Sequence, residues 1–228
     1  MDPSMQFAPS GARHARDPVS GYSHLAGLML AVVGVSVLVA RGIGSTGMLV
    51  STSVYGACLV ALYGASSAYH LAPSDVAQDS ARIRGLRKLD HAAIFAMIAG
   101  TCTPVFWRAF DGPRRVAMIA VIWGLAALGI LLRLVWMHAP RWLYTIMYVA
   151  MGWLFAVQAP RGFAALPGPI LALVVAGGVT YTLGALVYAL KRPNPFPRVF
   201  GFHEIWHVFV LGGSVLHYAA ILGLATST

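Results

Sequence analysis

The chain has 228 residues, of which 58% are hydrophobic and only 10% are charged. One soluble globule of this size cannot bury so much apolar surface, so the composition excludes a soluble fold and requires the excess to contact lipid. The formal net charge of +9 does not call for a nucleic-acid partner, because basic residues beside anionic headgroups account for it. Composition therefore predicts an integral membrane protein whose partners are membrane lipids.

Seven apolar segments follow in chain order, most of them near the roughly 20 residues that cross a bilayer as a helix. They are Gly21–Val39, Met48–Tyr69, His91–Phe110, Val116–Val135, Trp142–Val157, Pro169–Leu190 and His203–Leu224. The sequence thus predicts an all-α bundle of seven transmembrane helices. We expect residues 1–17 to form a polar cytoplasmic tail and residues 18–228 to form the transmembrane domain, because the tail lacks the apolar core of a signal peptide.

The positions of the lysines and arginines predict how the bundle is oriented. If the amino terminus is cytoplasmic, eleven basic residues lie on the cytoplasmic side and five on the other. The eleven are Arg13, Arg16, Arg82, Arg84, Arg87, Lys88, Arg133, Arg141, Lys191, Arg192 and Arg198. Because cytoplasmic loops carry an excess of Lys and Arg, we expect the amino terminus inside and the carboxyl terminus outside.

Ionisable side chains at the ends of the predicted spans are costly in a membrane and indicate a functional site. They gather at the predicted cytoplasmic side, where the second span ends and the first, third and seventh begin. They are His24, His70, Asp90, His91, His203, Glu204 and His207. The orientation was derived from Lys and Arg alone, so this convergence is independent of it.

Three of these histidines predict a metal site. His203 and His207 are four residues apart, so their imidazoles project from one face of a helix at a spacing that allows both to bind one ion. With His70 from another helix they make a three-histidine set with an open fourth position, as in catalytic zinc sites. Imidazole ligands suit Zn²⁺ better than magnesium or calcium. The alternative is that these histidines only hydrogen-bond to neighbouring helices.

Two acids and a serine are candidates for the chemistry beside this metal. Asp90 and Glu204 can orient a ligand, hold water at the metal or take its proton. Ser66, one helical turn before His70, can bond to a group beside the metal or to its own helix backbone. The alternative for the acids is a salt bridge to one of three neighbouring basic residues, Arg87, Lys88 and Arg198. His217 lies too far along its helix to join the site, and we expect it to form an inter-helix hydrogen bond.

The sequence resembles the haemolysin III group of the progestin and adipoQ receptor (PAQR) family, seven-helix membrane proteins that also look related to alkaline ceramidases. Three motifs match in order. They are Ser66-x-x-x-His70, the segment from Leu89-Asp90-His to Gly100-Thr-Cys-Thr-Pro104, and His203-Glu-Ile-Trp-His207. The family's first motif, Glu-x-x-Asn-x-x-x-His, is replaced here by Asp17-x-x-Ser20-x-x-x-His24, so the roles of Asp17 and Ser20 stay open.

The resemblance implies a zinc ion held by His70, His203 and His207, with Asp90 and Ser66 near the metal and its water. It also implies a zinc-dependent hydrolase of lipid amides, ceramidase-like and linked to membrane-lipid homeostasis, in the bacterial inner membrane. The haemolysin name implies pore formation instead.

Two other functions compete with hydrolysis of a lipid amide. His203-Glu204-x-x-His207 is also the His-Glu-x-x-His signature of metalloproteases, but no acidic residue follows Glu204 to serve as their third ligand. A non-enzymatic receptor, sensor or pore with structural zinc is the other alternative. A constitutive aqueous pore is disfavoured, because the helix interiors are mostly apolar and the polar residues lie at one end.

Overall fold

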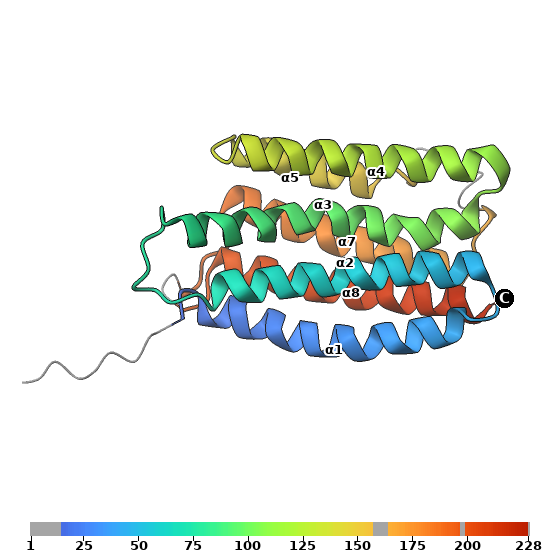
Figure 1. Cartoon of the computed structure of the whole chain (residues 1–228), viewed down its shortest axis with the longest axis horizontal. Helices are drawn as coiled ribbons and strands as arrows, with labels where there is room; N and C mark the ends of the chain where they lie inside the picture. The colour runs from blue at the N-terminus through green and yellow to red at the C-terminus, as the bar shows by residue number, and fades with distance from the viewer. Residues whose placement is uncertain (1–14, 157–163, 197–198, 228) are drawn as a thin grey trace, which may run out of the picture.

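The computed structural model describes residues 15–156, 164–196 and 199–227, and in that part of the chain it is all-helical. The helices are α1 (Pro18–Gly42), α2 (Thr46–His70), α3 (Ala81–Ala109), α4 (Gly112–Val135), α5 (Arg141–Gly152), α7 (Gly168–Leu190) and α8 (Phe202–Thr226). They lie side by side along the long axis of the molecule (Figure 1). Within the described residues, the predicted all-α bundle is therefore confirmed.

Six of the helices in the described part, all except α5, are long and apolar enough to cross a membrane. Local sequence explains where several of them begin. The Ser45 hydroxyl accepts a hydrogen bond from the Met48 amide at the start of α2, and the Ser80 hydroxyl does the same for Ile83 in α3. Pro113 lies in the first turn of α4, where its missing N–H leaves no bond unmade.

The fifth predicted segment differs from the prediction. Helix α5 covers only twelve residues, about 18 Å at the helical rise, which is short of the ~30 Å hydrocarbon core. It ends at Gly152, a poor helix former, and the Trp153 indole then donates to the Thr182 hydroxyl of α7 at 2.9 Å. The predicted end at Val157 lies outside the described residues. A seventh span and the orientation of the termini stay predictions.

The helices form two outer groups with α3 and α7 between them (Figure 1). Helix α1 packs against α2 and α8 on one side, and α3 packs against α4 and α5 on the other. Chain direction brings the start of α1, the end of α2 and the starts of α3 and α8 to one end of the bundle. The predicted site residues therefore collect at that end.

Candidate metal centre

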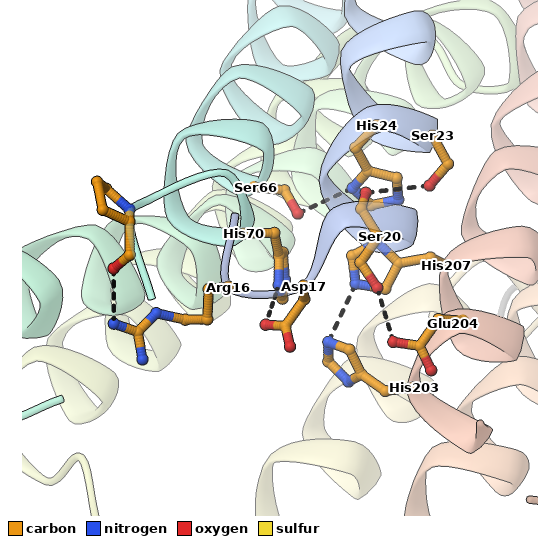
Figure 2. A network of polar contacts seen from close by, with 11 residues as sticks. Arg16, Asp17, Ser20, Ser23, His24, Ser66, His70, His203, Glu204 and His207 are labelled. Carbon is orange, nitrogen blue, oxygen red and sulfur yellow. Dashed lines mark hydrogen bonds and ion pairs between the residues drawn. The ribbon is translucent and has the colours of Figure 1, made fainter. Parts of the chain in front are cut away.

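Three histidines meet at this end of the bundle (Figure 2). His70 is the last residue of α2, and His203 and His207 occupy successive turns at the start of α8. One ring nitrogen from each lies within 4.8 Å of the other two, and this is the metal-binding geometry found among the described residues. The structure therefore assembles the predicted three-histidine set.

The positions of the ring nitrogens suit binding to a shared metal ion better than hydrogen bonding between the histidines. The Nε2 atoms of His203 and His207 are 3.2 Å apart, close to the separation of about 3.4 Å expected for two nitrogens on one tetrahedral zinc. His70 Nε2 is buried and has no hydrogen-bond partner among the described residues. A buried nitrogen left unpaired is unfavourable, and a shared cation satisfies all of these atoms.

Asp17 orients His70 toward the centre of the cluster. Its Oδ2 lies 2.9 Å from His70 Nδ1, which therefore carries the proton and leaves the Nε2 lone pair free to bind a metal. The same hydrogen bond lowers the pKa of the Asp17 carboxyl, against the opposing effect of partial burial. The Asp17 amide donates to the His70 carbonyl at 3.0 Å, which fixes this segment against the end of α2. The structure thus gives Asp17 a positioning role that the sequence left open.

His24 is a fourth histidine beside the cluster. Its ring centroid lies 4.0 Å from that of His207, and its Nδ1 lies 2.9 Å from the Ser66 hydroxyl. Both residues are buried in the bundle. Ser66 therefore connects α2 to α1 through a side chain, in place of the bond to its own helix backbone that was the alternative.

The two candidate acids have different surroundings. Both oxygens of Glu204 are engaged, because Oε2 accepts from the Gly201 amide at 2.7 Å and Oε1 accepts from the Ser20 hydroxyl at 3.2 Å. Glu204 therefore stabilises the start of α8 and its contact with α1. Asp90 is buried and within electrostatic reach of His70, and no salt bridge of it is found in the described residues. Asp90 therefore interacts with the Ser66 hydroxyl but, among the described residues, forms no salt bridge.

A cavity of about 350 Å³ opens beside the cluster. Ser66, Asp90, His203 and His207 line it at the histidine end, and most of its wall is apolar. His217 also lines it, and its Nε2 lies 3.0 Å from the Val174 carbonyl of α7, which confirms the predicted inter-helix hydrogen bond. A volume of this size, largely apolar with a few polar groups at one end, is typical of small-molecule sites.

The sequence indicates the family when it is compared with known proteins. A family model described as haemolysin-III related matches residues 13–218, which is most of the chain. The chain belongs to the haemolysin-III related family. With its long apolar helices, this makes it an integral membrane protein.

Three relatives show how far this similarity extends. The chain is 31% identical to the hemolysin-3 homolog of Bacillus subtilis, with 88% of this chain and 90% of the relative covered. It is 32% identical to hemolysin-3 of Bacillus cereus, over 88% of this chain and 87% of that protein. It is 37% identical to heptahelical transmembrane protein ADIPOR2 of Oryza sativa, over 59% of this chain and 65% of that protein. The similarity therefore extends from haemolysin-III proteins to the adipoQ receptor branch, as the motifs implied.

Proposed function

We propose that this haemolysin-III protein is a zinc-dependent hydrolase of lipid amides, similar in reaction to a ceramidase, and that it acts at the cytoplasmic face of the bacterial inner membrane in membrane-lipid homeostasis. One observation carries the proposal. The three histidine nitrogens lie within 4.8 Å of one another, and His203 and His207 border a largely apolar cavity inside the bundle. A metal centre at the wall of an apolar cavity suits a substrate with an acyl chain.

The residues around the cluster have different roles in the proposed reaction. Zinc held by three imidazoles supplies a Lewis acid that activates water toward an acyl carbonyl at neutral pH. His70, His203 and His207 would hold the ion, and Asp17 keeps His70 in the required tautomer. The Asp90 carboxylate accepts the proton of the attacking water, because it is buried at the cavity wall and free of a salt bridge within the described residues.

The environment of Glu204 separates this proposal from the metalloprotease alternative. In a His-Glu-x-x-His protease the glutamate is the general base. Here both of its oxygens accept hydrogen bonds that hold α8 against α1 and the preceding loop. The third donor of the cluster is His70 rather than an acid. The geometry therefore favours Asp90 as the base.

The test is lipid-amide hydrolysis by detergent-purified protein. We expect the wild type to hydrolyse a ceramide-type lipid, a chelator to abolish the reaction, and added zinc to restore it. Asp90→Asn should keep its zinc and lose turnover by roughly 10²–10⁴-fold, the range of general-base catalysis. Glu204→Gln, the matched change in the other acid, should reduce turnover far less.

Two outcomes would contradict the proposal. Turnover that survives the chelator would exclude a role for the metal in the reaction. Zinc bound without turnover of any lipid amide would show that the ion is structural, and the protein would then be a receptor, sensor or pore protein.

A further inference from the structure

The cavity is lined by two arginines as well as by histidines. Arg133 lies in the last turn of α4 and Arg141 begins α5, and both line the cavity together with Asp90. Asp90 is the one carboxylate among the residues that line this cavity in the described part of the chain. Two guanidinium groups therefore share the cavity wall with a single acid, and the wall carries excess positive charge.

Arg133 is a buried cation whose hydrogen-bond partners are neutral. Its residue surface is 9% exposed. Nη1 donates to the Met137 carbonyl at 3.0 Å, Nη2 contacts His91 Nδ1, and the guanidinium carbon lies 4.6 Å from the centroid of the Tyr144 ring. Within the described residues, no carboxylate lies at ion-pair distance from it. Arginine stays charged in proteins, and Asp90 is near enough to interact with Arg133 without forming an ion pair, so this buried charge is only partly compensated.

Arg141 extends this positive region toward the metal cluster. Its Nη1 donates to the Tyr188 carbonyl at 3.2 Å, and its guanidinium lies 4.6 Å from the centroid of the Tyr188 ring. His203 is within its electrostatic reach. Asp90 lies within reach of both His70 and Arg133. The two guanidinium groups therefore line the same cavity as His203 and His207 and interact electrostatically with residues beside the cluster.

We propose that the substrate is a lipid amide whose amine portion carries an anion, a carboxylate or a phosphate, and that Arg133, assisted by Arg141, holds this anion. The inference rests on the proposed function and deepens it by naming the substrate class. The acyl chain lies along the apolar wall, which includes Met97, Ile98 and Val149. Paired N–H donors of a guanidinium match the oxygens of either anion.

The reaction balances with water as the only co-reactant. Water oxygen bonds to the acyl carbon, the C–N bond breaks, and the proton that Asp90 took from water passes to the leaving nitrogen, while the other water proton stays with the acid. The products are a fatty acid and a small anionic amine, such as an amino acid or a phosphorylated amino alcohol. Ceramide, whose amine portion is neutral before cleavage, can be hydrolysed at the metal but offers no anion to the arginines, so it is the weaker ligand.

Binding of three ligands with one brominated acyl chain tests the proposal. They are an N-acylglycine, an N-acylethanolamine phosphate and the neutral N-acylethanolamine, which differ only at the end of the amine portion. Trp153 and Trp206 line the cavity, so bromine on the chain quenches their fluorescence when the ligand binds there. We expect purified wild-type protein to bind at least one anionic ligand about 10-fold more tightly than the neutral one. Which anion binds more tightly identifies the carboxylate or the phosphate as the natural group.

The variants separate anion recognition from a structural role. Arg133→Gln should remove the preference while leaving affinity for the neutral ligand within about 2-fold, Arg133→Lys should keep part of it, and Arg141→Gln should weaken it less. Arg82→Gln is the control, because Arg82 is an exposed arginine of α3 that does not line the cavity. It should keep the full preference.

Two results would overturn the inference. Equal affinity of wild-type protein for all three ligands would do so, whether or not Arg133→Gln folds. Equal weakening of all three by Arg133→Gln would show that the side chain only supports the end of α4. Because the readout is binding and not turnover, a failure of ceramide hydrolysis leaves this anion preference measurable by itself.

Discussion

The two sides of the cavity differ in how their polar groups come together. On the histidine side, His203 and His207 are neighbours on one helix, and His70 ends another that opens at the same end of the bundle. On the arginine side, Arg133 and Arg141 flank the connection from α4 to α5, and only the packing of α4 against α3 brings Arg133 to His91. The regular spacing of the histidines allows the first set to be predicted from the sequence. The arginine side is brought together only by tertiary packing, so the sequence does not predict it.

The two sides also differ in what satisfies their charges and lone pairs. The ring nitrogens of the cluster face one another or have no partner, which is the arrangement a cation completes. The guanidinium groups have neutral partners and, among the described residues, no acid within ion-pair distance, which is the arrangement an anion completes. One cavity thus has a site for a cation beside a site for an anion. This arrangement suits a substrate with an amide to be cleaved at the metal and an anion for the arginines to bind.

The largest effect is expected on the histidine side. His203→Ala removes one metal ligand and should weaken zinc binding by more than about 100-fold, beyond the range of a change in an outer residue. His217→Ala is the matched control, because His217 lies on the same helix and bonds to the Val174 carbonyl instead. Competition with a zinc-binding dye measures both. Equal zinc affinity in the two variants would contradict the three-histidine centre.

A smaller effect should follow from loss of the carboxylate that orients His70. Asp17→Ala should weaken zinc binding by roughly 10–100-fold, the usual cost of removing an outer partner of a histidine ligand. Asp75→Ala removes an exposed acid and should leave zinc binding as in the wild type. If the two variants bind zinc equally well, Asp17 has no positioning role.

These two sides show how much could be predicted from the sequence. Hydropathy placed the six long helices, and motif spacing placed His70, His203 and His207 at one end of them. The role of Asp17 stays open in the sequence because it lies before its helix and differs from the family's glutamate. Its signal was its register, seven residues before His24. The basic side could not be predicted, because Arg133 was counted only as a charge that sets orientation.

Packing between α3 and α4 holds Arg133 beside α3. One added methyl group at this contact should destabilise it. A Cβ at Gly129 would lie 2.3 Å from the Phe95 ring, so Gly129→Ala should lower the free energy of unfolding by roughly 1–3 kcal/mol. Gly124, on the same helix, has no atom within 4 Å of such a Cβ, and Gly124→Ala should be neutral or stabilising. Denaturation in detergent measures the difference. Equal stability of the two variants would contradict this α3–α4 contact.

The smallest effect should come from the hydrogen bond between α1 and α8. Ser20→Ala removes the donor to Glu204 and should lower the free energy of unfolding by about 0.5–1.5 kcal/mol. Ser36→Ala changes an exposed serine of α1 that bonds to its own helix and should cost less. The same denaturation experiment ranks the two. A larger loss for Ser36→Ala would show that the Ser20 contact contributes little.

The most direct test of the central claim is the zinc content and X-ray absorption spectrum of the purified wild-type protein. We predict about one zinc per chain, with nitrogen ligands at about 2.0–2.1 Å. The absorption spectrum should show the scattering that is typical of imidazole ligands. His207→Ala should lose this signal. Protein without zinc, or zinc bound by sulfur at about 2.3 Å, would contradict a three-histidine centre.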